Sequence, residues 1–96
     1  MYSKNTKFPF TIFLKGDVIM LDSVKVGRAI QKVREDKKQS QEVVSGLAGI
    51  GRTHLSAIER GERKPTLETF FKIADAMDMN ASELMVKIEN ELDEKY

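Results

Sequence analysis

The side chains that could carry catalytic or metal chemistry are few in this sequence. His54 is the one histidine among the 96 residues, and there is no cysteine. No glycine-rich loop is spaced to hold a phosphate, and no pair of carboxylates falls where a rigid pocket is expected. A metal site needs several ligands together, so His54 alone predicts none. The residue types therefore argue against an enzyme and predict no metal, no cofactor and no small-molecule ligand.

Charge is distributed unevenly along the chain. The formal net charge is only +1, yet residues 24–65 hold ten Lys and Arg against five Asp and Glu. Residues 66–96 have the opposite balance, with three basic side chains against eight acidic ones. A basic segment attracts a polyanion, whereas an acidic segment repels it. The pattern predicts one face that meets a polyanion and another that is turned away from it.

Length and hydropathy limit the protein further. Ninety-six residues, 41% of them hydrophobic, are enough for one domain with a single modest core. The longest apolar run, Phe8 to Leu14, is too short to span a bilayer, and it lacks a small-residue cleavage site. A chain without cysteine also suits a reducing compartment. We therefore expect a cytoplasmic protein with no membrane contact.

Helix caps and apolar residues at helical spacing predict an all-α domain of five helices. The expected helices span approximately residues 23–36, 41–48, 52–60, 66–77 and 81–93. Asp22-Ser23 offers N-caps for the first helix and Ser40 caps the second, Asn80 with Glu83 resembles a capping box, and Gly49 ends the second helix. The residues expected to point inward from the first four helices are Val26, Ala29, Ile30, Val33, Val44, Leu47, Ala48, Leu55, Ile58, Leu67, Phe70, Phe71, Ala74 and Met77.

Residues 1–22 have a different pattern from the helical part. Two apolar runs, residues 10–14 and 18–21, flank a Lys-Gly-Asp turn, a spacing that favours a β-hairpin. The alternatives are an arm that lies on the helical domain and a frayed terminus. The chain thus divides into an N-terminal arm or extension (1–22), a helical core (23–79) and a C-terminal helix (80–96).

Residues 41–58 carry the most informative spacing in the chain. Two helices that cross steeply over a tight turn need a small residue where their backbones meet, and Ser45 stands there. Four residues later the turn needs a positive φ, which Gly49 adopts without steric cost. Ile50 is expected to fill the corner between the two helices. This spacing predicts a helix-turn-helix within the helical core.

Four strings in this region match a known pattern. They are Ser40-Gln41-Glu42, Leu47-Ala48-Gly49-Ile50, Arg52-Thr53-His54-Leu55-Ser56 and the run from Ile58 to Thr66. Together they resemble the Cro/lambda-repressor (XRE) family over roughly residues 24–88, and the third string is similar to restriction–modification controller proteins in particular. The resemblance implies a lambda-repressor-like fold and a sequence-specific DNA-binding transcriptional regulator. The alternative is a protein-interaction module, such as an antitoxin or adaptor, on the same fold.

The resemblance also implies which residues bind double-stranded DNA. They are Gln41, Arg52, Thr53, His54, Ser56, Ala57, Arg63 and Lys64. Gln41 would donate to a phosphate and support the third helix, the recognition helix. Arg52 would read guanine in the major groove, because its planar fork matches two acceptors there, and the outward residues 53, 56 and 57 would face the same groove. His54 would contact the DNA backbone, as would Arg63 and Lys64.

Other positions concern the scaffold. Arg34 and Glu59 match the family's buried ion pair, and we expect them to support the fold rather than to contact DNA. Three residues depart from the family pattern. Lys38 stands where a glycine usually joins the first two helices, Gln39 stands where an apolar residue is common, and Gly51 replaces a serine N-cap.

The sequence also predicts assembly. One recognition helix reads only a few base pairs, so useful specificity requires two copies on a pseudo-palindromic operator. Leu84, Ile88 and Leu92 recur every four residues in an acidic segment, flanked by Met85. One helix can bury only part of such a stripe on its own domain. We therefore expect residues 80–96 to form the homodimer interface, with the arm as a second candidate surface.

Overall fold

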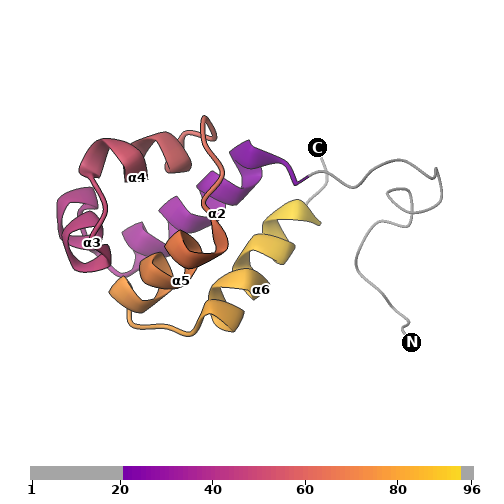
Figure 1. Cartoon of the computed structure of the whole chain (residues 1–96). Coiled ribbons are helices and arrows are strands. Elements are labelled where there is room, and N and C mark those ends of the chain that lie inside the picture. The colour runs from indigo at the N-terminus through magenta and orange to yellow at the C-terminus, as the bar shows by residue number, and fades with distance from the viewer. Residues whose placement is uncertain (1–20, 94–96) are drawn as a thin grey trace.

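The computed structural model of the protein describes residues 21–93, which form five helices joined by short loops (Figure 1). The helices are α2 (Ser23–Asp36), α3 (Gln41–Ala48), α4 (Arg52–Glu59), α5 (Leu67–Ala76) and α6 (Ala81–Leu92). The described residues contain no strand, so the predicted all-α domain is confirmed. None of these five helices is long and apolar enough to cross a membrane. The hairpin predicted within residues 1–22 lies outside the described residues, apart from Leu21 and Asp22.

The helices begin where the sequence provides caps. Asp22 Oδ1 accepts the backbone N–H two residues later at 3.0 Å, and Ser40 Oγ accepts the one three residues later at 3.0 Å. Glu83 Oε1 accepts the N–H of Asn80 at 2.8 Å, as in a capping box. The three predicted caps are therefore present.

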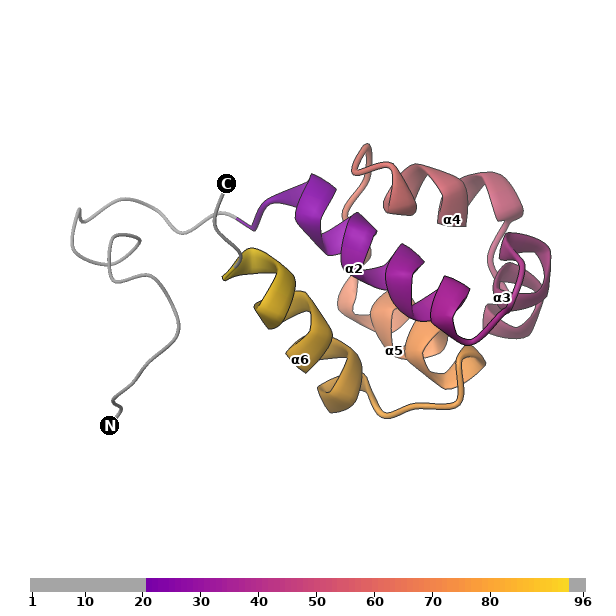
Figure 2. The ribbon, with the colours of Figure 1, turned by 180° about the vertical axis from the view of Figure 1, so that it is seen from behind.

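α2 is the central helix of the domain. α2 packs along α6 and crosses α4, while α3 packs against α4 and α5, and α5 also contacts α6. Front and back views agree that α4 and α6 lie on different sides of α2 (Figures 1 and 2). α4 is thus separated in space from the acidic α6, whereas α2, which belongs to the same basic segment, packs directly against it.

The core lies where these helices meet. Its fully buried large side chains are Ile30, Val44, Leu55, Ile58, Ile73, Met77 and Leu84. Burial of an aliphatic side chain of this size contributes about 1.5–3 kcal/mol to folding. Leu55 and Ile58 belong to α4, so the contacts that stabilise the domain also hold this helix in place.

α2 and α4 approach each other closely at Gly27. A Cβ atom here would lie 2.3 Å from the carbonyl oxygen of Ile58 and 2.6 Å from that of Glu59. A larger residue would push the end of α4 away from α2, because both obstacles are backbone atoms. Gly27 therefore fixes the position of the C-terminal end of α4.

The loop between α2 and α3 contains two of the departures from the family pattern. Lys38 has a φ of 58°, in the left-handed region, where a side chain with a Cβ costs about 1–2 kcal/mol. Gln39 is half-buried, and its Nε2 donates to the carbonyl of Ala76 at 3.4 Å. Lys38 thus adopts the left-handed backbone conformation that a glycine usually adopts at this position.

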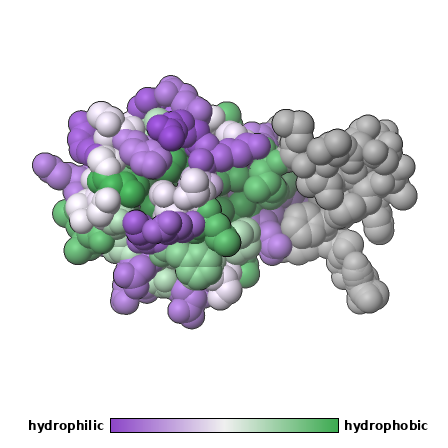
Figure 3. All heavy atoms as spheres, viewed as in Figure 1, coloured by the Kyte–Doolittle hydropathy of each residue, from purple (hydrophilic) through white to green (hydrophobic). Residues whose placement is uncertain are grey.

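Three residues predicted to point inward are exposed instead. Leu47 is 66% exposed, and Leu67 and Phe71 are exposed to a similar degree. Inward positions on these helices are taken by Val44 and by Phe70, so their apolar neighbours rotate to the outside. Apolar surface is accordingly visible over α3 and α5 (Figure 3).

The predicted dimer stripe on α6 requires a correction. Leu84 is 0% and Ile88 3% exposed, and Leu92 packs partly buried against the same core. They are buried because α6 lies along α2 and closes the core of its own domain. Leu84 and Ile88 have no surface left for a second copy. The exposed large apolar residues of α6 are Met85 and Val86.

Candidate nucleic-acid interface

α3 and α4 form the steep turn that the sequence predicts. Ser45 is buried where the two helices meet, and Gly49 has a φ of 73°. Ile50 donates its N–H to the carbonyl of Ser45 at 3.0 Å and packs against the core. The turn therefore holds α4 at a fixed angle to α3.

α4 has an inner and an outer face. Leu55 and Ile58 are buried, whereas Arg52 and Thr53 at the start of the helix are exposed. The partly exposed residues of α4 are His54, Ser56 and Ala57, and the loop that follows exposes Arg63 and Lys64. Every predicted DNA-contacting residue of α4 thus reaches the molecular surface.

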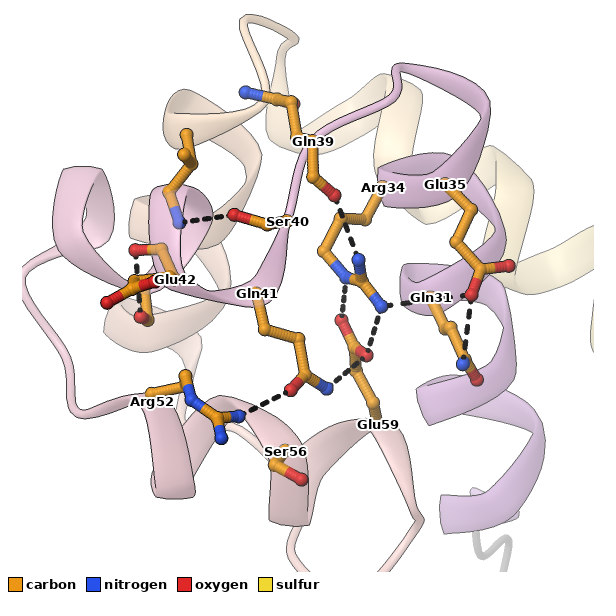
Figure 4. A network of polar contacts seen from close by, with 12 residues as sticks. Gln31, Arg34, Glu35, Gln39, Ser40, Gln41, Glu42, Arg52, Ser56 and Glu59 are labelled. Carbon is orange, nitrogen blue, oxygen red and sulfur yellow. Dashed lines mark hydrogen bonds and ion pairs between the residues drawn. The ribbon is translucent and has the colours of Figure 1, made fainter.

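A chain of hydrogen bonds leads from the core to Arg52 (Figure 4). Arg34 Nε donates to Glu59 Oε2 at 2.7 Å, and Arg34 Nη2 donates to Glu59 Oε1 at 3.0 Å. Gln41 Nε2 donates to the same Glu59 Oε1 at 2.9 Å, and Gln41 Oε1 accepts from Arg52 Nη1 at 3.1 Å. The exposed guanidinium of Arg52 is therefore tied, through the side chain of Gln41, to the buried Arg34–Glu59 ion pair.

The guanidinium of Arg34 makes a further hydrogen bond beside the ion pair. Arg34 Nη1 donates to the backbone carbonyl of Gln39 at 2.8 Å, in addition to its two bonds to Glu59. The hydrogen bond to Glu59 raises the pKa of Arg34, and the charge of Glu59 acts in the same direction, although burial opposes both. Arg34 remains charged in the folded protein and joins α2 to the end of α4.

Two features of this surface were not anticipated from the sequence. The first is the contact of Gln41 with both Glu59 and Arg52, which depends on side-chain conformations. The second is Arg60, directly after α4, whose guanidinium contacts Ser56 and Glu62. The four-residue spacing from Ser56 to Arg60 was the available signal, because residues four apart share a helix face.

Two helices joined by a tight turn, the second of them docked on the core with one face exposed, define the helix-turn-helix class of protein. Residues 30–84 match the model of the Helix-turn-helix family, so the chain belongs to this family. Similarity to individual proteins agrees with this membership. The HTH-type transcriptional regulator y4dJ of Sinorhizobium fredii is 35% identical over 60 residues, which are 62% of this chain and 78% of that protein.

Solved structures show the same likeness. The restriction-modification controller protein C.AhdI from Aeromonas hydrophila has a TM-score of 0.64 and 35% identity, covering 68% of this chain and 98% of that one. The controller protein C.Esp1396I, as a tetramer in complex with its natural 35 base-pair operator, has a TM-score of 0.70 and 24% identity, covering 77% of this chain and 97% of that one. The predicted resemblance to helix-turn-helix regulators and controller proteins is confirmed.

Proposed function

We propose that this protein is a sequence-specific transcriptional regulator that inserts α4 into the major groove of operator DNA in the cytoplasm. The observation that carries this proposal is the hydrogen-bonded chain that holds Arg52 at the exposed start of α4. An arginine that is already ordered loses less conformational freedom on binding, and its fork matches the two acceptors of guanine. Thr53, Ser56 and Ala57 complete the groove-facing surface.

The remaining predicted contacts supply affinity rather than sequence reading. His54, Arg63 and Lys64 are placed beside the recognition surface and would contact the sugar-phosphate backbone. Gln41 takes a double role, because its amide nitrogen carries two hydrogens and one already holds Glu59. The other hydrogen can donate to a phosphate while the amide oxygen holds Arg52.

We further propose that the regulator binds a pseudo-palindromic operator as a homodimer whose interface includes the outer face of α6. Next to Val86 lies an open groove of about 500 Å³ between the end of α2 and the start of α6. The residues that line it are Val33, Asp36, Lys37, Asp78, Met79, Glu83, Val86 and Lys87. Its rim carries both acidic and basic side chains, so the same surface of a second copy could complement it across a two-fold axis.

Substitution of Arg52 tests the regulator proposal. Sites selected from random duplexes by the full-length protein should share a half-site, and Arg52→Ala should weaken binding by roughly 1–3 kcal/mol and relax preference at one base pair per half-site. Lys72→Ala on α5 is the matched control, because it removes one exposed positive charge away from α4 and should keep the base preference. If Arg52→Ala retains wild-type affinity and preference, Arg52 does not read DNA. Absence of any salt-dependent DNA binding would instead favour the protein-interaction module.

A further inference from the structure

The outward face of α4 extends beyond the helix into the loop that follows. Arg52, Ser56 and Arg60 are spaced four residues apart, so their side chains lie along one side of the helix. Arg60 is exposed and is the C-terminal cap of α4. A cation at this place would extend the surface that begins with Arg52, but the guanidinium of Arg60 is already engaged.

Three nitrogens of the Arg60 guanidinium make hydrogen bonds within the protein. Nε donates to Glu62 Oε2 at 2.8 Å, and Nη2 donates to Glu62 Oε1 at 2.9 Å. Nη1 donates to the hydroxyl oxygen of Ser56. Glu62 thus binds two parallel N–H groups, the geometry in which arginine also binds a phosphate or the edge of guanine. The Glu62 carboxylate therefore occupies the Arg60 N–H groups that a phosphate or guanine could otherwise accept from.

The ion pair between Arg60 and Glu62 is weak enough for another anion to displace Glu62. Both side chains are more than half exposed, and exposed ion pairs are weak and screened by salt. The hydrogen bonds and charge of Arg60 lower the pKa of Glu62, so the carboxylate is ionised at neutral pH. Glu62 stands in the same short loop as Arg63 and Lys64, the only acidic residue between Arg60 and Pro65. Its negative charge therefore opposes DNA where its neighbours attract it.

We propose that Arg60 is a further DNA-contacting residue and that Glu62 is an internal competitor, which holds the Arg60 guanidinium until DNA displaces it. This inference rests on the proposed function. Displacement also frees Nη1 of Arg60 from Ser56, so the Ser56 hydroxyl becomes available to a base edge. While the pair is closed, Arg60 neutralises Glu62, whereas opening on DNA leaves the Glu62 carboxylate unpaired beside the phosphates. Glu62 thereby lowers the affinity for DNA that Arg60 contacts.

The test is a double-mutant cycle on DNA binding by the full-length protein at about 0.1 M salt. Glu62→Gln should tighten binding to a selected site by roughly three- to tenfold. Arg60→Gln should weaken binding, and adding Glu62→Gln to it should give a clearly smaller gain than in the wild type, because only the general repulsion of the carboxylate then remains. Glu68→Gln, an exposed acid of α5 paired with Lys72, is the matched control for the loss of one negative charge.

The outcomes separate the two proposals. Unchanged or weaker binding by Glu62→Gln overturns the inference alone, provided that the wild type binds DNA. An equal gain with or without Arg60, or an equal gain from Glu68→Gln, also overturns it, because Glu62 would then act only through net charge. A wild-type chain that binds no duplex refutes the proposed function and this inference together. All of these side chains are exposed, and circular dichroism should show unchanged folding of each variant.

Discussion

Glu59 determines how the polar side chains around it are oriented. A carboxylate only accepts hydrogen bonds, so Gln41 must present its amide nitrogen to Glu59 and not its oxygen. The amide oxygen of Gln41 then faces away and accepts from Arg52. A buried residue that touches no ligand thus sets the direction of a side chain at the surface. The ion pair with Arg34 in turn holds Glu59, so scaffold and recognition share one network.

Removal of the Glu59 carboxylate tests this network through stability. Glu59→Ala leaves the buried Arg34 without its partner, and we expect a loss of about 3–5 kcal/mol in the free energy of unfolding. Urea denaturation followed by circular dichroism measures this loss. Glu35→Ala is the control, since Glu35 is exposed and lies 3.9 Å from the same guanidinium. Equal midpoints for Glu59→Ala and the wild type would show that the pair contributes nothing to folding.

The residue types at the interface could be predicted from the sequence, but their connections could not. Arg52, Gln41 and Glu59 were each identified by position in the motif. That Gln41 joins the other two, and that Glu62 holds Arg60, depends on the rotamers of long side chains. Such side chains have many conformations of similar energy, and only the neighbouring groups in the folded protein select among them.

At the level of the helices, the first and last residue of each helix could be predicted better than the face that it buries. Ser40, Gly49 and the Asn80–Glu83 box act locally, so each end of a helix could be located from a few adjacent residues. Which face is buried depends on the partners of the helix. α3 and α6 carry apolar residues on more than one side, so Leu47 was placed inside and Leu84 outside in error.

α2 and α6 are joined by a polar contact as well as by the core. Glu91 of α6 is buried, and its Oε1 accepts from Lys32 Nζ at 3.1 Å, while Arg28 Nη1 lies 3.5 Å from Oε2. Burial alone would raise the pKa of Glu91, but the hydrogen bonds and charges of Lys32 and Arg28 outweigh it and hold the pKa below its ordinary value. The ionised form of Glu91 is therefore the one that stabilises the helix pair.

This contact makes a pH-dependent contribution to stability. The pKa of Glu91 is lower in the folded than in the unfolded chain, so its contribution is complete above the unfolded value and is lost as pH falls through the folded one. Glu91→Gln should cost roughly 1 kcal/mol at pH 7, and the cost should shrink as pH falls through the folded pKa, where the wild-type carboxyl takes up its proton. Urea denaturation of both proteins over a series of pH values from neutral to acidic gives the comparison. A difference that stays constant with pH would contradict the role of the charge.

At the scale of the whole molecule, the proposed recognition helix and the proposed dimer surface lie apart. α4 and α6 lie on different sides of α2, so a second copy that docks on α6 leaves both recognition helices free (Figures 1 and 2). To read two half-sites on one face of the duplex, the two copies of α4 in the proposed dimer must lie about 34 Å apart. The acidic side chains of α6 lie away from α4, where they do not oppose DNA that α4 would contact.

A substitution on the outer face of α6 tests this arrangement. Ile88 is unsuitable, because a charge there would enter the core and unfold the domain. Val86 is 50% exposed beside the groove, so Val86→Asp should keep the fold and shift sedimentation from dimer to monomer. Val43→Asp on α3 is the control, since Val43 is 48% exposed and should leave the dimer intact. The Val86→Asp monomer should bind DNA weakly and lose most of its preference for a palindromic site over a half-site. If both variants sediment like the wild type, the dimer forms elsewhere, and residues 1–20 become the next surface to test.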